Sequence, residues 1–162
     1  MLPEPPVSTF ASDNASGASP EVLQALVEAN DGYSIAYGDD RYTSELRSEI
    51  NTLFGREVAT FLAWGGTGAN VVGLQALIRP WQGIICTQSS HINVDECGAP
   101  ERFLGSKLID LPSPDGKLTA ELVQKQLGVL GIVHHVQPGA VSITQATEYG
   151  TVYSVEELKE IM

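Results

Sequence analysis

Apolar segments with strand character alternate along this chain with amphipathic helical segments, and this alternation restricts the possible folds more than any other feature. Chains of this kind bury their apolar residues by packing helices against a mainly parallel sheet. The sequence therefore predicts an α/β fold with three layers. The strands are expected at Val58–Ala63, Ile84–Thr87, Lys107–Leu111, Ile132–Val136 and Ala140–Thr144.

Residues suited to helix ends indicate where the helices begin and stop. Ser19 followed by Pro20 predicts the start of a helix that ends near Gly32, because a serine hydroxyl can accept from a free amide of the first turn and proline fits the first helical position. Gly55 is expected to end a second helix. Further helices are expected at Val71–Ile78, within Asn93–Phe103, and from Thr119 to about Leu127.

The domain organisation follows from both ends of the sequence. The proline-rich start, Leu2–Thr9, predicts an amino-terminal arm over residues 1–11, and residues 12–162 are expected to form part of one larger domain. Ser154 and Glu157 form a capping box that begins a last helix. Met162 follows after about two turns, where a parallel strand would normally come next. We therefore expect an α/β domain that is truncated within its pattern.

The charge of the chain argues against several classes of partner. Acidic residues outnumber basic ones by 20 to 9, which gives a formal net charge of -11. Such a surface repels nucleic-acid backbones and acidic lipid headgroups, so neither nucleic acid nor a membrane is expected as a partner. The residues after Met1 lack a signal-peptide pattern, and a cytoplasmic location is expected. Cys86 and Cys97 are expected to be ordinary reduced thiols.

The glycine-rich segment Gly65–Asn70 is the strongest local candidate for a binding site. It lies between a predicted strand and a predicted helix, where glycine lets the backbone approach a ligand and the helix start offers free amides to an anion. It contains no lysine, which excludes a Walker loop, and Val71 stands where a dinucleotide fingerprint has its third glycine. A phosphate site and a simple tight turn are the two interpretations.

A cluster of polar residues, His91–Cys97, follows the predicted strand at Ile84–Thr87. Open α/β sheets place their ligands at the carboxyl ends of strands, so His91 is a candidate functional residue, with a surface histidine as the alternative. The spacing is too sparse to predict a metal site. His134 and His135 lie in an apolar run, where one of them is expected to face the core.

Five motifs follow one another along the chain: Ser12–Gly17, Tyr37–Asp40, Gly65–Asn70, His91–Ala99 and Gln137–Ser142. As an ordered set they resemble the low-specificity L-threonine aldolases. That family belongs to the β-eliminating-lyase group of pyridoxal-phosphate enzymes, which have the aspartate-aminotransferase-like fold. The resemblance therefore implies that this chain is the amino-terminal half of such an enzyme's large domain.

The resemblance implies pyridoxal 5'-phosphate as cofactor and retro-aldol cleavage of β-hydroxy amino acids, such as L-threonine and L-allo-threonine, to glycine and an aldehyde. It implies that Gly66 and Thr67 hold the cofactor phosphate and that His91 stacks on the pyridine ring. Ser12 would contribute to binding the substrate carboxylate. His91, or a water held by a neighbouring group, is the candidate base. A homo-oligomer that acts on this small-molecule substrate is also implied.

The chain departs from the family pattern in one motif and lacks other parts of it. Gln145–Tyr149 stands where many members have Glu-Asn-Thr-His-Asn, so a family histidine near the substrate hydroxyl is absent. The Schiff-base lysine and the aspartate that pairs with the pyridine nitrogen match nothing in this chain, and we expect the chain alone to be inactive. Its lysines are expected to be solvated surface residues: Lys107, Lys117, Lys125 and Lys159. The alternative function is a non-catalytic phosphate-binding or interaction module, or an inactive fragment of an interrupted gene.

Overall fold

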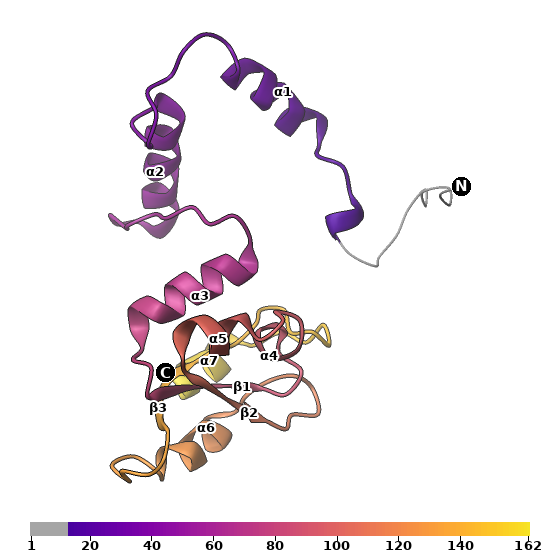
Figure 1. The fold of residues 1–162 in the computed structure, drawn as a ribbon. Helices are drawn as coiled ribbons and strands as arrows, with labels where there is room; N and C mark the ends of the chain where they lie inside the picture. Colours follow the sequence, from indigo (N-terminus) through magenta and orange to yellow (C-terminus); the bar gives the residue numbers. More distant parts are fainter. Residues whose placement is uncertain (1–12) are drawn as a thin grey trace, which may run out of the picture. The chain divides into compact units, whose positions relative to one another are not determined.

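The computed structural model of the chain describes residues 13–162. Ser12 and the arm predicted over residues 1–11 lie outside the described residues. The chain divides into two compact units, the first ending at Thr60 and the second spanning Phe61–Met162, and each is described by itself. The first unit contains a short 3-10 helix η1 (Asp13–Ala15) and the helices α1 (Pro20–Ala29) and α2 (Arg41–Phe54) (Figure 1).

The helices of the first unit confirm the predicted capping residues. Ser19 caps α1, where its hydroxyl accepts from the Val22 amide, although α1 ends at Ala29, three residues before the expected glycine. Gly55 ends α2 in the left-handed conformation, with a φ of 62°, which glycine adopts without steric penalty. The start of α2 was not predicted from a cap; there the Asp40 carboxylate accepts from the amide and hydroxyl of Thr43.

The second unit contains a parallel three-stranded sheet in the order β2-β1-β3. Ile84 in the central strand pairs with Leu108 on one side and Ala140 on the other. The elements of this unit, in chain order, are α3 (Gly66–Leu77), β1 (Gln82–Thr87), α4 (His91–Val94), α5 (Ala99–Leu104), β2 (Lys107–Leu111), α6 (Ala120–Leu127), β3 (Gln137–Val141) and α7 (Val155–Ile161).

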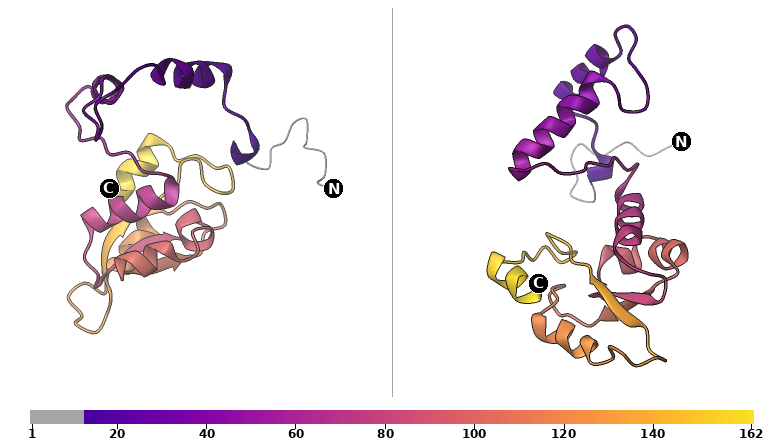
Figure 2. Two further views of the ribbon diagram at one scale, coloured as in Figure 1. Left: turned by 45° about the horizontal axis from the view of Figure 1, so that its top comes forward. Right: turned by 90° about the vertical axis from the view of Figure 1, so that its left-hand side faces the viewer.

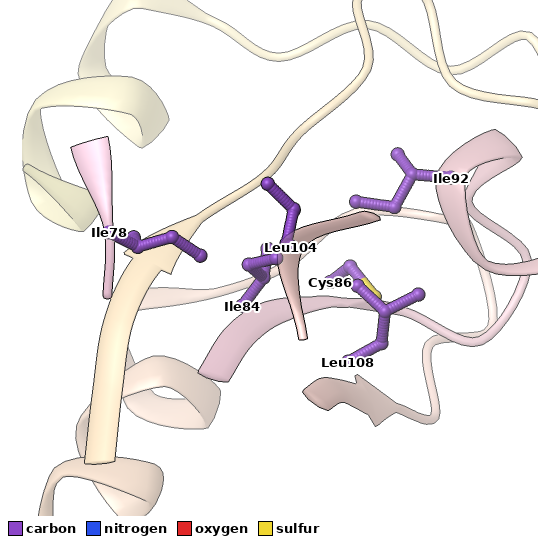
Figure 3. Packing of buried hydrophobic residues seen from close by; sticks show 6 residues of the cluster. All are labelled: Ile78, Ile84, Cys86, Ile92, Leu104 and Leu108. Atoms are coloured by element: carbon purple, nitrogen blue, oxygen red, sulfur yellow. The ribbon is translucent and has the colours of Figure 1, made fainter. Parts of the chain in front are cut away.

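The three predicted layers are present in this unit, because both faces of the sheet are covered by helices (Figure 2). Consecutive residues of a strand point to opposite faces, so Ile84 and Ile85, both almost fully buried, enter different cores. Ile84 packs with residues of α4, α5 and β2, as Figure 3 shows, and Val71 and Leu74 of α3 lie against this core. Ile85 packs with Leu118 and with residues of α6 and α7.

Two of the predicted strands are wrong. Residues 57–63 form no regular secondary structure, and the side chains of Phe61 and Leu62 are exposed. A strand needs a neighbour for its backbone groups, and within residues 13–162 none pairs with this segment. The amide of Val58 instead donates to the Asn51 side chain at the end of α2.

Residues 132–136 also form turns and not the expected strand. The side-chain amide of Gln137 donates to the carbonyl oxygens of Val129, Ile132 and His135, which folds this segment back on itself. Both His134 and His135 are exposed, so the expectation that one of them faces the core is also wrong. The strand begins only at Gln137, and of the predicted Ala140–Thr144 only the first two residues belong to β3.

The last helix confirms the capping box. The Ser154 hydroxyl accepts from the Glu157 amide while the Glu157 carboxylate accepts from the Ser154 amide. The other oxygen of that carboxylate binds the Lys117 ammonium, whose side chain is only 18% exposed. Lys117 is therefore a partly buried ion-pair partner and not the solvated residue expected from the sequence, because it ties the β2–α6 connection to α7.

Candidate functional site

Three segments of the second unit meet beyond the carboxyl ends of its strands. His91 follows β1 after a tight turn, in which the buried Ser90 donates its hydroxyl to the Thr87 carbonyl. Glu148 lies in the loop that follows β3, and its carboxylate accepts from the His91 amide at 2.7 Å. Asn70, in the second turn of α3, is linked to the same region because its side-chain amide donates a hydrogen bond to the carboxylate of Glu96. Ligands of open parallel sheets bind at this edge.

The start of α3 carries the donors expected of an anion site. Gly65 is its N-cap in an extended conformation, and no side chain caps the helix there. The first intrahelical bond runs from the Ala69 amide to the Gly65 carbonyl, so the three amides of Gly66–Gly68 have no partner within the helix. Added Cβ atoms at Gly65, Gly66 and Gly68 would meet nothing within 4 Å, so a ligand can approach the backbone closely. These amides, the helix dipole and the Thr67 hydroxyl fit a phosphate group.

His91 is held by its neighbours while its ring faces solvent. It begins the four-residue helix α4, and the next side chain, Ile92, is buried in the core (Figure 3). Its backbone is bonded to Glu148, and its ring Nδ1 lies 2.9 Å from Oε1 of Glu96, yet 54% of its side chain is exposed. Glu96 therefore holds the ring at Nδ1, while the exposed part of the ring remains accessible to a ligand.

Glu96 is the most unusual residue of the site because its side chain is completely buried. One carboxylate oxygen, Oε1, accepts from Asn70 Nδ2 at 2.7 Å and contacts His91 Nδ1. The other, Oε2, has no hydrogen-bond partner within residues 13–162. Cys97 and Gly98 follow with positive φ values of 52° and 67°, and this sharp reversal separates α4 from α5 within the segment where one helix was expected.

Glu148 replaces the histidine that many members of the resembled family have in this motif, and the structure places it beside His91. Its Oε1 accepts from both the His91 amide and the Thr144 hydroxyl. From the sequence, Glu148 was identified only as a departure from the family motif, and its position beside His91 was not predicted. Asn70 and Glu96 belong to motifs identified in the sequence, but no local pattern indicates that residues 26 apart bond to each other.

Other candidate groups are not brought to this site. Cys86 is a buried residue of β1, and this burial raises the pKa of its thiol, which favours the protonated form. Lys107 begins β2 at the opposite edge of the sheet, and the ammonium groups of Lys117 and Lys125 are paired with Glu157 and Glu121.

In residues 13–162 no cluster of three or more histidine, cysteine or acidic side chains could hold a metal ion. No helix in that range is long and apolar enough to cross a membrane.

Comparisons with known proteins agree on one family. Residues 9–162 match the family model of the beta-eliminating lyases. The chain is 42% identical over 153 residues to a low specificity L-threonine aldolase of Pseudomonas sp. (strain NCIMB 10558) and 43% identical to that of Pseudomonas aeruginosa. Each match covers 94% of this chain and 44% of the relative, so the chain spans less than half the length of these relatives. The structure resembles the solved threonine aldolase of Leishmania major with a TM-score of 0.84 and 33% identity, over 90% of this chain and 43% of the other.

Proposed function

We propose that this chain, which belongs to the beta-eliminating lyase family, supplies part of the active site of a pyridoxal-phosphate-dependent aldolase. Its substrates would be small β-hydroxy amino acids such as L-threonine and L-allo-threonine, cleaved to glycine and an aldehyde. The observation that carries the proposal is the placement of an open anion-binding helix start and an oriented, exposed His91 at one edge of the sheet. The similarity to threonine aldolases supports the choice of substrate.

The start of α3 would hold the phosphate of the cofactor. The amides of Gly66–Gly68 and the Thr67 hydroxyl would donate to the phosphate oxygens, and the positive end of the helix dipole would favour their negative charge. Pyridoxal phosphate, when bound, supplies an electron sink for the electron pair released as the Cα–Cβ bond breaks. The role of the helix is to fix the position of that group with respect to the residues after β1.

His91 would act on the face of the cofactor ring and on the substrate. Its imidazole is exposed and held in place through Nδ1, so the ring can stack on a planar ligand while Nε2 points away from Glu96. We assign to Nε2 the removal of the proton from the substrate's β-hydroxyl, which starts the cleavage. Anchoring the ligand at both Thr67 and His91 also fixes the orientation of the bond that breaks.

Further groups are required for activity, and we propose that this chain does not provide them. None of its lysines lies in a motif that resembles the cofactor lysine, so the chain alone is proposed to be inactive. Ser12, which would bind the substrate carboxylate, is outside the described residues. A cytoplasmic location and a homo-oligomer are part of the same proposal, by analogy with an enzyme of amino-acid metabolism.

A chimera tests the proposal. Residues 9–162 replace the matched segment of the Pseudomonas aeruginosa aldolase, and cleavage of L-threonine is followed by glycine formation. We expect activity in the chimera, a fall in kcat/KM of at least about tenfold with His91→Ala, and little change with Lys125→Ala on the exposed face of α6. The 162-residue chain by itself should show no turnover. A folded chimera that is inactive, or equal activity in the His91 variant, would contradict the proposal.

A further inference from the structure

We propose that Glu96 is a positioning residue that selects the tautomer of His91, so that Nδ1 carries the ring proton and Nε2 presents its lone pair to the ligand. Its carboxylate contacts the ring directly and receives a second bond from Asn70 on α3. The inference deepens the proposed function, on which the significance of His91 Nε2 rests.

The tautomer follows from which atoms are donors and acceptors. Oε1 of Glu96 already accepts the N–H of Asn70 at 2.7 Å, so it acts as an acceptor. An imidazole nitrogen 2.9 Å from the same oxygen must donate, which places the proton on Nδ1. A neutral imidazole has one N–H, and Nε2 is then left as the acceptor. A base that removes a hydroxyl proton needs this form at the atom that faces the substrate.

The burial of Glu96 indicates that its carboxylate serves more than the stability of the fold. The side chain has no exposed surface, and Oε2 has no hydrogen-bond partner among the residues that the structure describes. Burying a carboxylate with one oxygen unpaired is unfavourable, and an apolar side chain of similar size would fill the space at a lower free-energy cost. A buried carboxylate oxygen without a hydrogen-bond partner is rare in native structures and indicates a role other than filling space in the core.

Asn70 links this pair to the anion-binding helix. It lies four residues after Gly66, in the second turn of α3, and its amide is the donor that holds Glu96 Oε1. Because a helix turn is rigid, an anion bound at the start of α3 and the ring of His91 are held in one connected arrangement. The chain of contacts Asn70–Glu96–His91 therefore orients the imidazole toward whatever the helix start binds.

The protonated ring nitrogen can be identified directly. Long-range proton–nitrogen spectra of the 162-residue chain, labelled with nitrogen-15 at histidine, are recorded at a pH at which the rings are neutral. We expect His91 to be protonated at Nδ1, with the exposed His134 and His135 as internal references. Glu96→Gln keeps an acceptor oxygen and should keep this tautomer, whereas Glu96→Ala should shift His91 toward the tautomer of the references.

Glu148→Ala is the matched control, because Glu148 binds the backbone of the same histidine and leaves its ring alone. We expect it to keep the Nδ1 proton. A His91 protonated at Nε2 in the unmodified chain would overturn the inference, even if Glu96→Ala failed to fold. So would a folded Glu96→Ala variant with an unchanged His91 spectrum. Because these spectra need no cofactor, a separate titration with pyridoxal phosphate distinguishes failure of this inference from failure of the proposed function.

Discussion

Truncation of Ile84 and Ile85 tests whether both faces of the sheet are covered. These neighbours in the central strand are 0% and 1% exposed and enter different cores. Ile→Ala removes three carbon atoms, which at about 0.8 kcal/mol each gives about 2.4 kcal/mol of lost transfer free energy. The cavity left behind adds to this, and the total loss is expected to be about 3 to 4 kcal/mol at each position.

The assay is urea unfolding followed by far-UV circular dichroism, with the free energy of unfolding obtained by linear extrapolation. Ile143→Ala is the control, because that residue is 39% exposed beyond the end of β3 and should lose less than half as much stability. If either alanine variant does not fold, Ile→Val at the same positions should cost about 1 kcal/mol each. A loss at Ile85 no larger than at Ile143 would refute the three-layer arrangement.

Two further predictions concern helix ends and exposed apolar surface. The Glu157 carboxylate accepts hydrogen bonds from Lys117 and from the Ser154 amide, and these bonds lower the pKa of the carboxyl. The ionised carboxylate therefore stabilises the fold fully above the ordinary carboxyl pKa of about 4.3. This stabilisation is lost as the pH falls through the lowered pKa. Acid unfolding of Glu157→Gln should lack this component, and identical acid profiles for both chains would contradict the assignment. The chain should also self-associate at micromolar concentrations, because in the described part of the chain β3 pairs only with β1 and the apolar residues of α1 are exposed. A monodisperse monomer in light scattering would refute this.

Local chemistry explains why much of the fold could be predicted from the sequence. The caps at Ser19, Thr119 and Ser154 bond residues three positions away, so a short pattern contains all the information needed. The segment 107–111 was predicted with the bounds of β2, because it lies between clear turn residues. The strand predicted at 132–136 was wrong because the side-chain amide of Gln137 donates to carbonyl groups of this apolar segment. No local sequence pattern indicates that contact.

The candidate site was predictable in its parts and not in its connections. A helix near the glycine segment and the position of His91 after a strand were predicted from the order of elements, although α3 already begins at Gly66, inside the segment that was expected to be a turn. The burial of Glu96, its bond to Asn70 and the contact between Glu148 and His91 depend on the packing of segments that are 26 and 57 residues apart. Such contacts are set by tertiary structure, and a single sequence offers no local signal for them.

Titration of the backbone amides with pyridoxal phosphate tests the central claim most directly. At millimolar ligand, the amide signals of Gly66–Gly68 should shift first, and inorganic phosphate should move the same signals. Thr67→Val removes one donor to a charged group, and with a contribution of about 1.5 kcal/mol it should weaken binding about tenfold. Thr52→Val, on the exposed surface of α2, should change nothing. Shifts at Gly66–Gly68 that require about tenfold more ligand in the Thr67 variant would support the account, whereas no shift there at millimolar ligand in the unmodified chain would contradict it.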